Sequence, residues 1–242
     1  MNNKQSWYSI NAKQTDKFVD VYLYDEVGSY GISAKDFVND IKLLKGKDIY
    51  LHVNCVGGEV FDGMAIYNTL KKYKGKVIAY VEGIAASMGS IIPLAADEII
   101  MSENSLYMIH NAWGGAMGEA SDMRKTAALL DKLSSEIANI YTKKTGLPLS
   151  QIEEMMNEET WFSSEEALEY GFIDKVSDAV MVAAKYDMTK FKNKTQKEIV
   201  NQLNNNQKSK KMTEELKSWF NTKVEEIVAA VKGEVDTIEV SE

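Results

Sequence analysis

The stretch KDIYLHVNCVGGEVFDGMAIYNTLKKYKGKVIAYVE, residues 47–82, contains two apolar runs separated by a helical pattern. The runs 47–55 and 75–82 are short and rich in β-branched residues and tyrosine, which is typical of strands. Between them, residues 60–73 repeat apolar positions at helical spacing. The residues that suit one face of this helix are Phe61, Met64, Ala65, Tyr67 and Leu70. Strand, helix and strand in this order predict a right-handed crossover between parallel strands, and hence an α/β fold.

The same alternation continues on both sides of this stretch. Further strands are predicted at 18–25, 96–102 and 105–111, and a further helix at 34–45. A long helix is predicted from Glu119 to Lys144, because its apolar residues recur every three or four positions. Gly146 and Pro148 are expected to end this helix.

Bulk composition excludes several classes of function. The 242 residues are 45% hydrophobic, which is enough for a sizeable core, and the net charge of −8 argues against binding to nucleic acid or to an anionic membrane. The single cysteine excludes an internal disulfide and a thiolate metal cluster, and no metal or organic cofactor is implied. The opening residues lack an apolar signal-like run, and no stretch of about 18 apolar residues occurs. We therefore expect a cytoplasmic site of action.

The chain changes character near residue 190. We divide it into an N-terminal segment 1–17, a domain 18–190, a polar basic linker 191–211 and an amphipathic C-terminal helix 212–242. The last segment repeats apolar residues at helical spacing, with Thr213 as its predicted N-cap. It is expected either to pack on its own domain or to pair with another chain.

Two loops in the domain have the composition of a catalytic site. Gly57 and Gly58 follow a predicted strand and precede a helix, where they can take positive φ and turn backbone N–H groups toward a developing negative charge. The alternative is a tight turn without a ligand. Ser87 also stands between a strand and a helix, as in a nucleophile elbow, although the G-x-S-x-G pattern is absent. A cap or a satisfied core hydroxyl is the alternative for this serine.

A nucleophilic serine needs a base, and the chain has two histidines. His52 lies inside a predicted strand, where we expect a satisfied imidazole. His110 ends a strand, and side chains there overhang the edge at which open α/β sheets hold their sites, so His110 is the predicted base. A carboxylate would fix its tautomer, but spacing alone does not choose among the acids that flank loops. These acids are Asp62, Glu82, Asp97, Glu158, Glu159 and Asp174.

Four ordered motifs together resemble the proteolytic subunit of Clp protease, ClpP, and particularly its phage relatives that act as head maturation proteases. They are NCVGGEVFDGMAIYNTL (54–70), GIAASMGS (83–90), YMIHNAWGG (107–115) and TWFSSEEALEYGFID (160–174). The resemblance covers about residues 18–180 and implies a ClpP/crotonase-type fold and a serine endopeptidase.

The resemblance also implies roles for individual residues. Ser87 matches the nucleophile and His110 the base, while Gly58 and Met88 match the backbone N–H donors of the oxyanion hole. The acid position falls on Glu159, where chaperone-linked members carry Asp, and Glu158 is the alternative.

For the whole protein the resemblance implies homo-oligomeric rings that stack through the long helix, with protein or peptide substrates. The phage likeness points to capsid and scaffold proteins as partners, inside procapsids or in the host cytoplasm. Residues 212–242 are then expected to be a capsid or scaffold tether, for which Met212 could be an internal start. Three alternatives stay open: a proteolytic subunit serving a separate ATP-dependent unfoldase, a crotonase-type acyl-CoA enzyme, and an inactive assembly protein.

Overall fold

A computed structural model describes residues 8–11, 17–29 and 31–179. The strands are β1 (Tyr8–Asn11), β2 (Phe18–Leu23), β3 (Asp48–Cys55), β4 (Val77–Ala86), β5 (Glu98–Ser102), β6 (Leu106–Ile109), β7 (Thr160–Phe162) and β8 (Lys175–Ser177). The helices are α1 (Ala34–Leu43), α2 (Val60–Lys71), α3 (Met88–Ile91), α4 (Ala120–Thr145), α5 (Leu149–Asn157) and α6 (Ser164–Glu169), with a 3-10 turn at Ile92–Ala95. Every strand and helix that the sequence predicted in this part of the chain is present, with ends shifted by a few residues.

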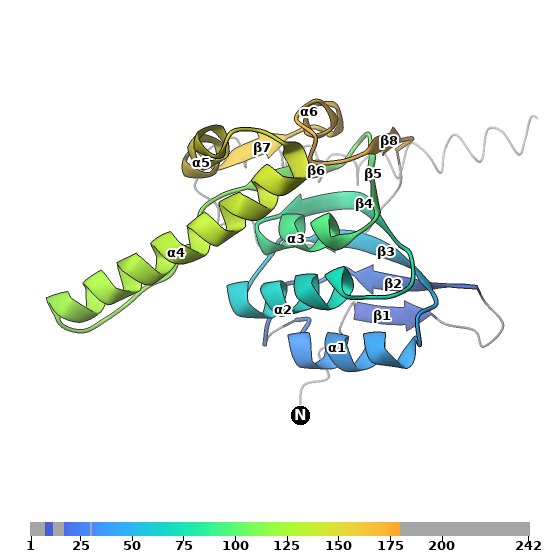
Figure 1. Ribbon diagram of the computed structural model, residues 1–242, viewed down its shortest axis with the longest axis horizontal. Coiled ribbons are helices and arrows are strands. Elements are labelled where there is room, and N and C mark those ends of the chain that lie inside the picture. Colours follow the sequence, from blue (N-terminus) through green and yellow to red (C-terminus); the bar gives the residue numbers. More distant parts are fainter. Residues whose placement is uncertain (1–7, 12–16, 30, 180–242) are drawn as a thin grey trace, which may run out of the picture. The chain divides into compact units, whose positions relative to one another are not determined.

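The strands form one mostly parallel sheet in the order β1-β2-β3-β4-β5-β8. Pairs β2–β3, β3–β4, β4–β5 and β5–β8 are parallel, and helices cross over between several of them (Figure 1). The end of β4 also pairs in parallel with β6, which in turn pairs with β7 antiparallel. The predicted α/β fold with a parallel sheet and crossover helices is therefore confirmed.

The structure describes part of the predicted N-terminal segment but neither of the two predicted C-terminal segments. β1 lies within the segment 1–17 and pairs antiparallel with β2, so part of that segment joins the sheet. The predicted linker 191–211 and the predicted helix 212–242 lie outside the described residues.

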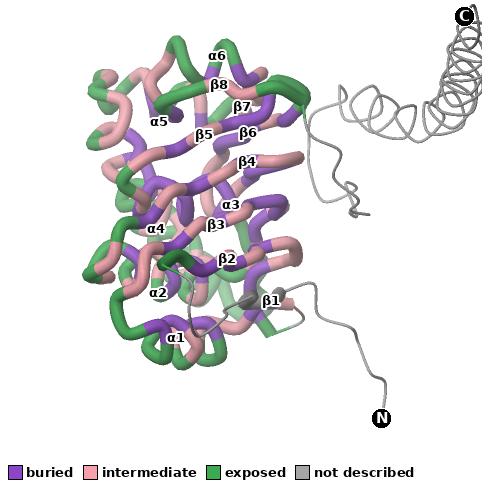
Figure 2. The backbone as a smooth tube through the Cα atoms, turned by 90° about the vertical axis from the view of Figure 1, so that its right-hand side faces the viewer, coloured by how far each residue is buried: buried purple, intermediate pink, exposed green. Residues whose placement is uncertain are grey.

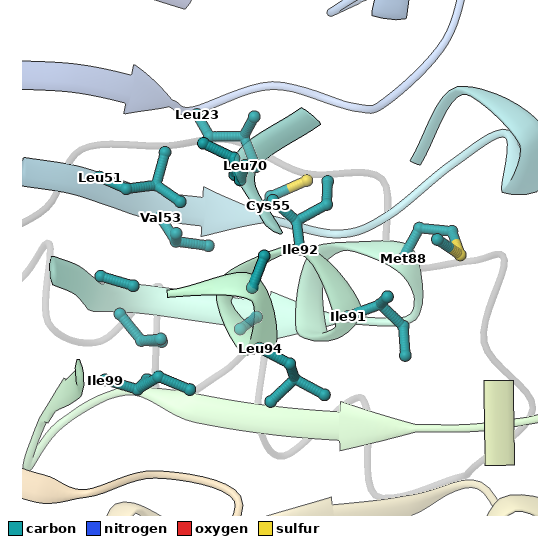
Figure 3. Packing of buried hydrophobic residues seen from close by; sticks show 14 of the residues in the cluster. Leu23, Leu51, Val53, Cys55, Leu70, Met88, Ile91, Ile92, Leu94 and Ile99 are labelled. Carbon is teal, nitrogen blue, oxygen red and sulfur yellow. The ribbon is translucent and has the colours of Figure 1, made fainter. Parts of the chain in front are cut away.

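One face of the sheet forms the core. Along β2 and the first part of β3 every second side chain is buried, as in Val21 and Leu51, while their neighbours Tyr22 and Tyr50 are partly exposed. Buried and intermediate positions along these strands are coloured in Figure 2. This alternation arises because successive side chains of a strand point to opposite faces. Helices α1, α2 and α3 cover the buried face, where Leu70, Met88 and Ile92 pack over the strand residues (Figure 3).

The buried face of α2 differs from the prediction. Phe61 is 69% exposed and Ala65 is exposed, whereas the buried residues are Gly63, Ile66 and Leu70. A Cβ on Gly63 would lie only 2.5 Å from the Met88 Cε. The helix therefore turns its glycine toward α3, where a larger residue would require the Met88 side chain to shift.

The long helix α4 has the predicted ends but two different halves. Glu119 and Asp122 form a capping box at its start, and Gly146 ends it in the left-handed conformation with φ 76°. The second half packs on the core through Ile137, Ala138 and Tyr141. The first half projects from the sheet (Figure 1). Its apolar side chains Met123 and Leu129 are exposed. Among the described residues, none of the helices combines the length and apolar character that a membrane span requires.

Candidate active site

Ser87 stands at a sharp turn between β4 and α3. Its φ of 55° and ψ of −127° lie outside the regions that L-residues ordinarily adopt, at a cost of roughly 1–3 kcal/mol. Strand, strained serine and helix follow one another as the sequence predicted. Such a turn lifts the hydroxyl above the carboxyl end of the sheet, which is the property of a nucleophile elbow.

His110 comes to Ser87 through the pairing of two strands. β6 pairs with the end of β4, with Ala86 opposite Met108, and the Ser87 N–H donates to the Met108 carbonyl at 3.1 Å. Both residues that follow these strands therefore reach the same edge. The His110 Nε2 lies 2.8 Å from the Ser87 Oγ, within hydrogen-bond distance. The structure thus brings together the predicted nucleophile and the predicted base.

Glu159 lies on the opposite side of the imidazole. β7 pairs with β6, placing Thr160 opposite Ile109, so the residue before β7 comes next to the residue after β6. The Glu159 Oε2 is 3.7 Å from the His110 Nδ1, and Glu159 is 5% exposed. Its φ of 51° is a second strained position at this site. Glu158, the alternative acid, is exposed.

The other acids that flank loops hold backbone or side-chain groups elsewhere. Asp62 accepts from the Ala34 N–H at the start of α1. Asp97 and Asp174 accept from the backbone N–H groups of Val77 and Ile99. Glu82 contacts His52 on the other face of the sheet. Of the six acids, Glu159 is therefore the one whose carboxylate faces His110.

The two glycines pass directly beside Ser87. A Cβ on Gly57 would lie 2.6 Å from the Ser87 Cβ, so only glycine permits this approach. Backbone hydrogen bonds from the Val27 N–H to the Gly57 carbonyl, and from the Glu59 N–H to the Val27 carbonyl, fix the turn. Within the described residues, no acceptor takes the N–H of Gly58 or of Met88. These two N–H groups are therefore open to an acceptor from outside the described residues.

His52 is confirmed as a satisfied imidazole. Its Nδ1 lies 2.9 Å from Glu82 and its Nε2 lies 3.2 Å from Asp20, and the ring stacks on Tyr22 and Tyr80. Burial lowers the pKa of His52, but the hydrogen bonds and charges of the two carboxylates outweigh this and raise it above its ordinary value. This histidine is occupied in holding three strands together.

Cys55 is an unsuitable nucleophile, although it ends β3 near the glycine turn. It is fully buried, and burial raises the pKa of its thiol to about 12. The reactive form of cysteine is the thiolate, which this environment suppresses at neutral pH. In the part of the chain that the structure describes, no group of three or more His, Cys, Asp or Glu side chains could hold a metal ion.

Sequence reasoning did not single out the polar residues that lie behind Ser87. Ser90 contacts both the Ser87 carbonyl and the Tyr141 hydroxyl, and the Ser90 and Tyr141 side chains are buried. A hydroxyl three residues after the nucleophile, inside an otherwise apolar run, was the available signal for Ser90. Tyr141 carried no such signal, since it follows the apolar spacing of its helix.

Comparisons with known proteins show which family the chain resembles. The Clp protease family model matches residues 2–180. The chain is 33% identical over 140 residues to ATP-dependent Clp protease proteolytic subunit 1 of Leifsonia xyli subsp. xyli, covering 57% of this chain and 71% of the relative. It is 38% identical over 134 residues to the ATP-dependent Clp protease proteolytic subunit of Deinococcus radiodurans, covering 54% and 66%. With subunit 1 of Synechococcus sp. it shares 40% identity over 144 residues, covering 57% and 71%.

Proposed function

The chain belongs to the Clp protease family and is a serine-type endopeptidase, and we propose that Ser87, His110 and Glu159 carry out its chemistry. The observation that carries this proposal is the 2.8 Å contact between the Ser87 Oγ and the His110 Nε2, made by a strained serine at the carboxyl end of the sheet. The base is in position to take the hydroxyl proton without a movement of the backbone.

The proposed reaction is acyl transfer in two steps. The Ser87 Oγ attacks the peptide carbonyl while the His110 Nε2 takes its proton. Glu159 faces the Nδ1 side of the ring, where its charge favours the tautomer with a proton on Nδ1 and stabilises the imidazolium. The N–H groups of Gly58 and Met88 hold the oxyanion, and His110 then protonates the leaving amine. Water releases the acyl group from Ser87 in the second step.

A fluorophosphonate probe tests this chemistry, because it reacts with an activated serine. We expect wild type to be labelled and to cleave peptides, and Ser87→Ala to do neither while remaining folded by circular dichroism. The matched control is Ser135→Ala, which removes an exposed hydroxyl from α4 and is expected to leave both activities unchanged. A wild type that is not labelled but hydrolyses an acyl-CoA thioester would favour the crotonase-type alternative. A wild type that is not labelled and does not hydrolyse the thioester would favour an inactive assembly protein.

For the biological role we propose processing of capsid and scaffold proteins during phage head maturation, in procapsids or in the host cytoplasm. The support is the motif likeness and the amphipathic sequence of 212–242, which lies beyond the family match. A second role is favoured by the relatives, whose names describe them as ATP-dependent. In that role the chain is the proteolytic subunit for a separate unfoldase.

These two roles predict different requirements for cleavage. Head maturation predicts that purified protein processes its capsid and scaffold proteins without ATP, and that Ser87→Ala does not. The unfoldase-linked role predicts that folded substrates are cut only with an ATPase partner and ATP. Cleavage of the capsid and scaffold proteins that required both an ATPase partner and ATP would contradict the head-maturation proposal.

Members of the family form oligomeric rings, and we propose that this chain forms rings that stack through the projecting half of α4. That half and the loop before it expose large apolar side chains, with Met117 99%, Trp113 63%, Met123 51% and Leu129 47% exposed. Burial of these side chains against another chain would remove apolar surface from water. A strict monomer in native mass measurement at high concentration would contradict the ring.

A further inference from the structure

A chain of buried hydroxyl groups lies directly behind the nucleophile. The Ser90 Oγ is 2.6 Å from the Ser87 carbonyl oxygen and 2.7 Å from the Tyr141 hydroxyl. The Tyr107 hydroxyl donates to the Ser90 carbonyl at 2.5 Å. Ser90 and Tyr107 are fully buried, and Tyr141 is 1% exposed. These groups connect α4, α3 and β6 beneath Ser87.

The direction of these hydrogen bonds follows from the chemistry of the groups. A carbonyl oxygen only accepts, so the single proton of the Ser90 hydroxyl goes to the Ser87 carbonyl. The Tyr141 hydroxyl is then the donor to the Ser90 Oγ. Burial raises the pKa of Tyr141 above its ordinary value, so the phenol keeps the proton that this bond requires. The chain of donors therefore runs from α4 to the carbonyl of the nucleophile.

The Ser87 carbonyl shares a peptide plane with one of the proposed oxyanion donors. In a trans peptide the carbonyl and the following N–H point in opposite directions, and no peptide bond in the described residues is cis. The Ser87 oxygen accepts from both the Ser90 N–H, at 2.9 Å, and the Ser90 Oγ. These two bonds hold the Ser87 carbonyl oxygen toward the core. The Met88 N–H, on the opposite side of the same peptide plane, therefore points away from the core.

We propose that Ser90 and Tyr141 are positioning residues that hold the Ser87–Met88 peptide plane so that the Met88 N–H faces the reacting carbonyl. This inference rests on the proposed function, because it assumes that Ser87 is the nucleophile and Met88 an oxyanion donor. The strained backbone of Ser87 explains the need for such support, since its dihedral angles are not ones that the residue adopts unaided.

The test measures fluorophosphonate labelling of full-length protein, because a phosphoryl oxygen uses the same N–H donors as a peptide oxyanion. The rate of labelling per active site reports positioning, whereas its final stoichiometry reports the folded fraction. The variants are Ser90→Ala, Tyr141→Phe and the double variant. Tyr73→Phe is the matched control, since it removes a phenol that donates to the Lys47 carbonyl at 2.7 Å, away from Ser87.

We expect one label per chain in every variant. Labelling slows about tenfold in Ser90→Ala, less than the hundredfold or more that loss of an oxyanion donor costs, because the Ser90 N–H still holds the carbonyl. Labelling slows about threefold in Tyr141→Phe. This variant loses one neutral hydrogen bond, from Tyr141 to Ser90, and that bond acts on the Ser87 carbonyl only through Ser90. The double variant is no slower than Ser90→Ala, since Tyr141 acts through Ser90. For peptide cleavage, kcat falls by the same factors while KM and the pH dependence of the rate stay unchanged.

Two results would overturn the inference while leaving the proposed function intact. One is that Ser90→Ala and Tyr141→Phe are each labelled as fast as wild type. The other is reduced stoichiometry at an unchanged rate, which would mean that the hydroxyl groups stabilise the fold alone. Tyr141→Phe keeps the volume of the side chain, so it decides the matter by itself where Ser90→Ala does not fold. An unlabelled wild type would instead refute the proposed function.

Discussion

Replacement of Glu159 by Gln tests the acid of the proposed triad with a minimal change of shape. The variant keeps the size of the side chain and removes its charge 3.7 Å from the His110 Nδ1. Glu158→Gln is the matched control, because it makes the same chemical change on the adjacent, exposed residue. Any general effect of losing an acid from this loop appears in both variants.

The expected size of the effect follows from the distance and the burial. Two unit charges 3.7 Å apart interact by about 4.5 kcal/mol at an effective dielectric constant near 20. This is the stabilisation that the imidazolium loses in the transition state, and each 1.36 kcal/mol corresponds to a tenfold change in rate. Since Glu159 is 5% exposed and the His110 side chain 11%, solvent screens the pair only in part. We expect kcat/KM to fall by roughly 10²- to 10³-fold.

The assay compares kcat/KM for a fluorogenic peptide between wild type and the two variants, with thermal unfolding as the check on folding. Glu158→Gln is expected to stay within about twofold of wild type, as surface substitutions ordinarily do. Equal activity of Glu159→Gln and wild type would refute the assignment of the acid. An equal loss in both variants would refute the distinction between the two residues.

Three further perturbations probe the surroundings of the site. Gly58→Ala places a Cβ 1.9 Å from the Val27 carbonyl oxygen, so the turn must shift. Fluorophosphonate labelling of Ser87 should then slow roughly 100-fold or more, and an unchanged rate would exclude the Gly58 N–H from catalysis. His52→Asn should lower the melting temperature more at pH 6 than at pH 9. The pKa of His52 is raised in the folded protein, so its stabilising contribution is complete below the unfolded pKa of about 6.5 and is lost as the pH rises through the folded pKa. An equal loss of melting temperature at both pH values would contradict this. Leu129→Glu should reduce the assembly size in light scattering, and an unchanged mass would remove this part of α4 from the contact.

Much of the site was predictable because its chemistry leaves local traces in the sequence. A serine between a strand and a helix, a histidine at a strand end and twin glycines before a helix each have a local geometric reason. Their convergence depends on the pairing of β4 with β6, which joins residues 23 positions apart at 2.8 Å. The family resemblance supplied this long-range information, since spacing along the chain does not contain it.

The remaining features depend on contacts that a periodic pattern does not encode. The buried face of α2 was predicted in part, because Leu70 is buried as expected, whereas Phe61 is exposed and Gly63 lies against Met88 instead. The acid could not be chosen from spacing, because Glu158 and Glu159 are adjacent and differ only in the backbone turn that aims them. Tyr141 followed a hydrophobic repeat, and its hydrogen bond to Ser90 appears only in three dimensions.

The central claim, that Ser87 is a nucleophile activated by His110, is tested most directly by locating a fluorophosphonate adduct by mass spectrometry in the folded protein. We expect a single adduct on Ser87 in wild type, and labelling slowed at least 100-fold in a folded His110→Gln variant, because the general base is then lost. An adduct on another residue, or equal labelling of the His110→Gln variant, would contradict it.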